Sequence, residues 1–159
     1  MTRSERQLHL DPAQPTSPAP IPGQRPAPGP GTARIAVDLL GGDAAPAVVV
    51  DGALRAYDAD PDLSLLLVGP AEVADEIIGA LPPARRDSVW VDPVRRVVGM
   101  ADSPLRAVRS DTTVRAGVAA VANGRAVGLV TAGASGAAVT AAVHGFGRQP
   151  GVRRPAMCA

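Results

Sequence analysis

The segment TAGASGA at residues 131–137 has residue types that suit the binding of an anion. It lies between an apolar run, residues 126–130, and an alanine-rich stretch that favours a helix. Glycines such as Gly133 and Gly136 let a backbone approach a ligand closely. The first amides of a following helix favour phosphate or a developing oxyanion. Taken alone, however, such a pattern more often marks a structural turn than a binding site.

Another glycine turn, Gly41-Gly42-Asp43, follows the apolar run 34–38 and precedes the apolar stretch 47–54. Asp43 suits the acidic start of a helix, and Pro46 suits its first turn. Neither turn has the G-x-G-x-x-G pattern of dinucleotide sites. A P-loop is excluded because all 16 basic residues are arginine.

Alternating strands and helices must position these two turns. The apolar patterns predict strands near residues 34–38, 63–68, 88–91 and 126–131, and helices near 46–58, 71–80, 112–123 and 136–145. This alternation predicts parallel strands with helices on the faces of the sheet. Ligands bind beyond the carboxyl ends of such strands, so both turns are expected to meet at one crevice.

The helix near 112–123 has the clearest boundaries. Thr112 or Asp111 can cap its start, and Asn123-Gly124 can end it. Three valines, at positions 114, 118 and 121, form one apolar face.

Composition narrows the class of protein. Hydrophobic residues make up 46% of the chain, but Trp, Tyr and Phe occur once each, so the core must be aliphatic. A net charge of +1 gives no electrostatic case for nucleic acid. The single cysteine, Cys158, excludes an internal disulfide and paired-cysteine metal sites, which favours the reducing cytoplasm. We expect no transmembrane segment and no signal peptide.

Residues 1–33 differ from the rest, because they hold eight of the 17 prolines. We predict a disordered tail there, followed by one α/β domain at 34–159. A Pro-rich ligand for a partner, or a start codon assigned too early, are alternatives for this segment.

Five segments in the same order resemble one family. They are DLLGGDAAP at 38–46, LLLVG at 65–69, MADSP at 100–104, TAGASGA at 131–137 and GRQPGVRRPA at 147–156. They are similar to motifs of the bacterial phosphate acyltransferases, which form acyl phosphate from acyl-acyl-carrier-protein and inorganic phosphate in phospholipid synthesis. The resemblance covers residues 34–159 and matches only the amino-terminal part of the family's pattern.

The resemblance implies a doubly wound, mostly parallel α/β sheet like that of the isocitrate and isopropylmalate dehydrogenases, here incomplete. It also implies a cytoplasmic homodimer without cofactor or metal, with acyl-acyl carrier protein and phosphate as partners and peripheral membrane association. Asp43 and Ser135 are then the candidate catalytic residues. The candidate substrate- and phosphate-binding residues are Gly41, Gly42, Ser103, Thr131, Gly133, Ser135, Gly136 and Arg148.

Several residues have a structural alternative. Asp38 and Asp43 could instead order a turn, and the segment 102–104 could cap the helix after it. His144 and Cys158 fit packing or solvated positions better than catalysis. Arg148, like the arginines at 153 and 154, could meet phosphate or an acidic carrier protein or simply be solvated.

The chain also departs from the family's motif. Ala134 stands where the family has an asparagine, and the segment after residue 104 lacks the family's lysine. The alternative function is therefore a catalytically silent, truncated remnant or anion-binding fragment of the same fold.

Overall fold

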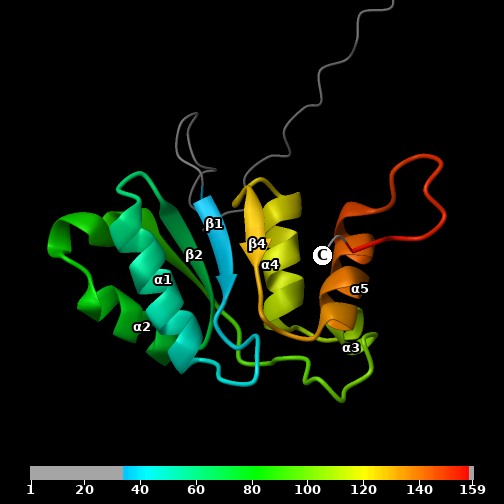
Figure 1. Ribbon diagram of the computed structural model, residues 1–159, viewed down its shortest axis with the longest axis horizontal. Coiled ribbons are helices and arrows are strands. Elements are labelled where there is room, and N and C mark those ends of the chain that lie inside the picture. Colours follow the sequence, from blue (N-terminus) through cyan, green and yellow to red (C-terminus); the bar gives the residue numbers. More distant parts are fainter. Residues whose placement is uncertain (1–33, 158–159) are drawn as a thin grey trace, which may run out of the picture.

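A computed structural model describes residues 34–157 of the chain, in which four parallel strands form one sheet between helices (Figure 1). The strands lie in the order β3-β2-β1-β4, so the chain moves outward from β1 to β3 and then returns to the other side of β1. The strands are β1 (Arg34–Asp38), β2 (Ser64–Gly69), β3 (Val89–Pro93) and β4 (Gly128–Val130).

Five α-helices and one 3₁₀ helix connect and flank these strands. They are α1 (Ala47–Ala59), α2 (Ala71–Ala80), the 3₁₀ helix η1 (Pro83–Ser88), α3 (Arg106–Arg109), α4 (Thr113–Ala122) and α5 (Ser135–Phe146).

One face of the sheet packs against α1 and α2. Alternate residues of β1 and β2, such as Val37, Leu65 and Leu67, point into this core because successive side chains of a strand face opposite sides. Tyr57 of α1 and Ile77 of α2 close it, and both are fully buried.

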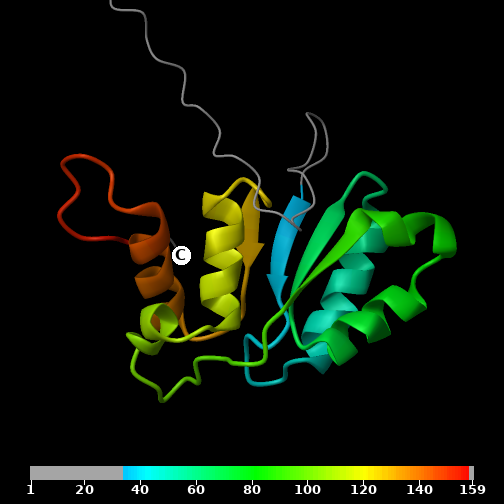
Figure 2. The ribbon, with the colours of Figure 1, turned by 180° about the vertical axis from the view of Figure 1, so that it is seen from behind.

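The other face of β1 and β2 packs against α4, and α5 lies on the far side of α4 (Figure 2). Ala36 and Leu66 contact this layer from the sheet, and Ala120 contributes from α4. Gly117 of α4 is needed for this packing, because a Cβ atom there would lie 2.5 Å from the Leu129 Cδ1 atom of β4.

The strand order reverses between β1 and β4, which makes this pair the topological switch point of the sheet. The register pairs Ala36 with Leu129 and Val37 with Val130. The chain leaves both strands at the same edge, so the glycine turns that follow them begin side by side. Crevices at such points are where open α/β sheets bind ligands.

The architecture confirms the predicted α/β sheet of parallel strands, and each predicted strand and helix is present with ends shifted by at most a few residues. The apolar pattern does not predict η1, and α3 is expected only as a helix without bounds after residue 104; both are short and have no apolar periodicity. Predictions for residues 1–33 and for Cys158 lie outside the described residues.

Two predicted helix starts are wrong in detail. Thr112 does occupy the N-cap position of α4, but its side chain makes no capping hydrogen bond. Asp43 lies before the start of α1, whose N-cap is Pro46 and whose first turn holds no acidic residue. In neither place does a side-chain hydrogen bond cap the start of the helix.

Candidate anion-binding site

The first glycine turn, residues 41–43, and the second glycine turn, residues 131–137, contact each other directly at the carboxyl ends of β1 and β4. A Cβ atom on Gly41 would lie 2.6 Å from the Thr131 Oγ1 atom and 2.9 Å from the Gly133 amide nitrogen. Gly42 has φ +109°, a conformation that favours glycine, and its neighbour across the gap is Ala132. The predicted convergence of the two turns on one place is therefore confirmed.

Asp38, at the end of β1, links the turns through a chain of hydrogen bonds. Its Oδ1 atom accepts from the Leu40 amide at 3.1 Å, and its Oδ2 atom accepts from the Thr131 hydroxyl at 2.8 Å. The Thr131 Oγ1 atom in turn accepts from the Gly133 amide at 3.1 Å. Asp38 is buried, so removing either partner would leave polar atoms without compensation.

The start of α5 presents amides that the protein itself does not use. Within residues 34–157, the Ser135 and Gly136 amides have no hydrogen-bond acceptor, and Ala134 at the N-cap offers no side-chain acceptor. Both residues are exposed. Free amides at a helix start, together with the helix dipole, form an anion-binding position.

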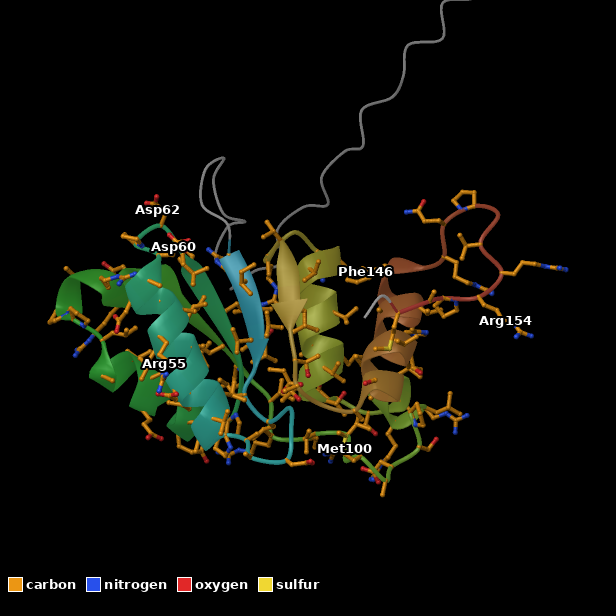
Figure 3. The ribbon with its side chains drawn as sticks, in the orientation of Figure 1. Arg55, Asp60, Asp62, Met100, Phe146 and Arg154 are labelled. Carbon is orange, nitrogen blue, oxygen red and sulfur yellow. The ribbon has the colours of Figure 1, made fainter. Side chains whose placement is uncertain are left out.

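A third segment reaches the same helix start. A Cβ atom on Gly136 would lie 3.1 Å from the Pro104 Cγ atom, so the segment 102–104 packs against the first turn of α5. This contact brings Ser103, which is exposed, to the edge of the site. Met100, two residues before Asp102, marks the same edge of the molecule in Figure 3.

Asp102 orders this third segment. Its Oδ2 atom accepts from the Gly99 amide at 3.0 Å, and its Oδ1 atom accepts from the Arg106 guanidinium at 2.8 Å. The Gly99 hydrogen bond and, next, the Arg106 partner lower the pKa of Asp102 below its ordinary value. Asp102 thus braces a turn instead of capping α3 through that helix's amides, which answers one of the alternatives left open by the sequence.

A small enclosed space lies beneath the second turn, with a volume of about 10 Å³. Asp38, Thr131 and Ala134 line it, and so does Thr113 from the first turn of α4. Thr113 is fully buried, and its hydroxyl has no hydrogen-bond partner within the described part of the chain. Thr113 is not among the candidate residues that the sequence indicates, although two adjacent threonines at a helix start are a visible signal.

An apolar groove of about 480 Å³ adjoins the site on the α1 face of the sheet. Its walls include Val48 and Val49 of α1, Val130 of β4, and Ala132 of the second turn. Val130 is 59% exposed and Val48 is 63% exposed, so the described residues leave this part of the sheet uncovered. The site therefore has a polar end, at the turns, and an apolar flank.

Two predicted site residues, Asp43 and Arg148, make no hydrogen bond with the other site residues in the described part of the chain. Asp43 is exposed and makes no hydrogen bond or ion pair among residues 34–157. Arg148 follows the carboxyl end of α5, about 18 Å from its start at 1.5 Å per residue. Its guanidinium donates to the Arg153 carbonyl at 3.0 Å, so Arg148 lies too far away to share an anion with Ser135.

Neither a metal cluster nor a membrane-spanning helix is found in the described part of the chain. No group of three or more His, Cys, Asp or Glu side chains is placed to hold a metal ion among residues 34–157. Within the same residues, no helix has both the length and the apolar character needed to cross a bilayer.

Comparison with known proteins then identifies the family. The family model described as "Fatty acid synthesis protein" matches residues 33–159, which include every element described above. This chain belongs to that family. Its glycine turns and the segment 102–104 therefore lie within the region that the family model matches.

Relatives of this family member carry the name phosphate acyltransferase. The chain is 36% identical to the protein of that name from Salinibacter ruber over 127 residues, which is 78% of this chain and 38% of the relative. It is 42% identical to the one from Anaeromyxobacter sp. strain K, over 79% of this chain and 35% of the relative. For Pseudomonas putida the identity is 35%, over 79% and 38%. The chain thus spans little more than a third of the length of the curated relatives it matches.

Proposed function

We propose that the second glycine turn holds inorganic phosphate, which attacks the carbonyl of an acyl thioester and leaves as acyl phosphate. The donor would be acyl-acyl carrier protein, as the resemblance of the motifs implies, and the name of the relatives, phosphate acyltransferase, fits transfer of an acyl group to phosphate. The observation that carries this proposal is the unused pair of amides, at Ser135 and Gly136, beside a turn that Asp38 holds in place.

Phosphate is itself the nucleophile in such a reaction, so no side chain needs to become acylated. One oxygen of hydrogen phosphate forms the new bond to the acyl carbon, the carbon–sulfur bond breaks, and the carrier leaves as its thiol because its sulfur takes the proton that the phosphate gives up. The protein then has to position the two reactants and stabilise the oxyanion that forms between them. Amides fixed at a helix start supply that stabilisation without reorganising during the reaction.

The predicted residues take distinct roles in this proposal. The Ser135 hydroxyl and amide, with the Gly136 amide, contact the anion, and Ser103 approaches from the third segment. Gly41, Gly42 and Gly133 allow the turns to approach each other, and Thr131 fixes their spacing. Asp43 is proposed to act on the substrate from the exposed side of the first turn.

The apolar groove next to Ala132 is proposed to hold the acyl chain. Its volume of about 480 Å³ falls within the roughly 300 to 1,000 Å³ typical of ligand pockets, and its walls are almost entirely aliphatic. An acyl chain lying against Val48 and Val130 would place its thioester carbon at the polar end of the groove, beside the second turn.

A second candidate function is anion binding without turnover. Ala134 favours it, because this N-cap position has no side-chain hydrogen-bonding group. Predictions of a homodimer, a cytoplasmic location and peripheral membrane contact stay predictions.

A thiol-release assay separates the two candidates. Acyl-acyl carrier protein is incubated with the chain, with and without phosphate, and free carrier thiol and acyl phosphate are measured. The same assay uses a chimera in which the remaining part of the Anaeromyxobacter relative follows residue 159. Phosphate-dependent release by the chimera supports the enzyme, whereas phosphate binding without release by either protein supports the silent fragment.

A further inference from the structure

Charge is divided unequally between two halves of the described chain. Residues 34–93, with α1, α2 and η1, hold eleven acidic residues and four arginines. Residues 94–157, with α3, α4 and α5, hold nine arginines and two aspartates. Figure 3 shows Asp60 and Asp62 at one end of the molecule and Arg154 at the other. A net charge near zero for the whole chain therefore conceals one acidic and one basic half.

The basic half contains a concave groove between α3, α5 and the segment after α5. Its volume is about 660 Å³, and its floor is aliphatic. The side chains that line it include Leu105, Val108, Val139, Val143, His144 and Arg148. Leu105 is 49% exposed, so the apolar floor is open to solvent within the described residues.

Arg148 lines this groove, and three more arginines adjoin its lining residues along the chain: Arg109 follows Val108, Arg154 precedes Pro155, and the Arg153 carbonyl accepts from Arg148. Arg109 lies on α3, and Arg153 and Arg154 follow α5; all three are exposed. Among residues 34–157, the acidic side chains that form ion pairs do so with other arginines, as Asp102 does with Arg106. Arg109, Arg153 and Arg154, which are neighbours of groove-lining residues in the chain, thus form no ion pair among the described residues.

We propose that this groove docks an acidic protein that lays the apolar stripe of a helix on α3 and α5 while its carboxylates meet these arginines. The inference rests on the proposed function, because the partner with this chemistry would be the acidic carrier that brings the acyl group. Helix-in-groove contacts supply affinity in such complexes, and complementary charge supplies orientation and association rate.

The position of the groove favours this partner. The α5 helix joins the groove to the candidate anion site, since Thr140, which lines the groove, donates its hydroxyl to the Gly136 carbonyl at 2.7 Å. A carrier docked on α5 would hold its acyl thioester within reach of the second turn. A lipid surface fits less well, because membrane-binding helices present apolar side chains on a projecting face, whereas these valines line a concave one.

Binding of the 159-residue chain to a bacterial acyl-acyl carrier protein tests the proposal by fluorescence anisotropy at low and high salt. The double variant Arg109→Glu/Arg154→Glu should weaken binding roughly tenfold at low salt and flatten its salt dependence, because two exposed charge pairs are reversed. Arg55→Glu, on α1 of the acidic half, is the matched control and should change affinity less than twofold. The neutral pair Arg109→Gln/Arg154→Gln should give an intermediate loss and guards against a folding defect of the reversed variant.

Equal affinity of wild type and both double variants, or no binding by the wild-type chain, would overturn the proposal. Binding of the chain to vesicles of anionic phospholipid is measured as well. If the double variants bind these vesicles less tightly than the wild type but bind the carrier equally, the surface is a membrane contact and the proposal is overturned. Acyl phosphate formation, measured in parallel on the chimera, keeps the two ideas separate. If the chimera turns over and both double variants leave its KM for the carrier unchanged, the docking surface alone is rejected. If the carrier binds in a charge-dependent way but no acyl phosphate forms, the proposed enzyme activity is rejected and the docking surface is kept.

Discussion

The two glycine turns have similar compositions but opposite physical roles. In the first turn Gly41 is buried, and a side chain there would collide with Thr131 and the backbone of Gly133. In the second turn Ser135 and Gly136 are exposed, with amides that bond to no acceptor among the described residues. Glycine in the first turn thus serves close packing between chain segments. In the second turn Gly133 packs against Gly41 in the same way, and only the exposed amides of Ser135 and Gly136 are proposed to receive a ligand.

Asp38 makes the difference possible. Its carboxylate orders the first turn through the Leu40 amide and the second through the Thr131 hydroxyl, so both turns are held by one buried side chain. The Gly133 amide donates to Thr131 as part of this arrangement, whereas the amides of Ser135 and Gly136 have no acceptor among the described residues. The first turn is thus the scaffold of the second, which is the turn proposed to face the ligand.

The largest effect is expected for Gly41→Ala, which places a side chain in the first turn, where it packs against the second. The new Cβ atom would approach the Gly133 amide nitrogen and the Asp38 carboxylate at 2.9 Å each, so the second turn must shift. We expect a loss of about 3 kcal/mol in the free energy of unfolding, measured by urea denaturation. Gly79→Ala is the control, because nothing lies within 4 Å of that position on α2, and alanine there should stabilise the helix. Equal stability of the two variants would mean that the turns do not pack as described.

Ala134→Asn sharpens the role of the ligand-facing turn. It places an amide at the N-cap of α5, the position where the family motif has asparagine. In the chimera described above, an added oxyanion donor should raise the phosphate-dependent transfer rate roughly 10²-fold. Ala134→Asp is the control, since aspartate caps a helix as well as asparagine but, when ionised, has no hydrogen to donate. A rate raised equally by both variants would show that capping alone limits activity.

A smaller effect is expected for Thr131→Val, which removes the hydroxyl shared by the two turns while keeping the shape of the side chain. The Asp38 Oδ2 atom and the Gly133 amide would then lose their partner. The free energy of unfolding should fall by about 2 kcal/mol. Thr140→Val removes a hydroxyl that bonds only to a carbonyl of its own helix, and should change stability by less than about 0.5 kcal/mol. Similar losses of stability in both variants would contradict the role of the Thr131 hydroxyl as the group that links the two turns.

The smallest effect concerns the third segment. The pKa of Asp102 is lowered in the folded protein, so its contribution to stability is present above the unfolded pKa and is lost as pH falls through the folded one. Acid should therefore loosen the turn at 99–106 and shift the amide of Gly136, which lies beside Pro104. A carboxyl NMR titration checks this, and Arg106→Gln should raise the pKa of Asp102 partway toward its ordinary value. A wild-type pKa at or above that ordinary value contradicts the arrangement.

Local patterns were enough to predict most of the fold, whereas the details of the site depend on contacts between distant segments. Apolar runs and glycine stops predicted β1, β2 and α4 because these elements bury continuous or periodic apolar faces. The bond between Asp38 and Thr131 joins residues 93 positions apart. It follows only from the strand order, which no local pattern encodes, and the same holds for the burial of Thr113 and for the distance of Arg148 from the turns.

A phosphate titration followed by amide NMR tests the central claim most directly. Inorganic phosphate is added to the 159-residue chain, and each backbone amide shift is followed against an equal ionic strength of chloride. We predict that the Ser135 and Gly136 amides shift most and saturate, while the Gly133 amide, which bonds to Thr131, moves little. Saturable shifts that leave Ser135 and Gly136 unchanged, or no saturable shift at all, would contradict an anion site at the start of α5.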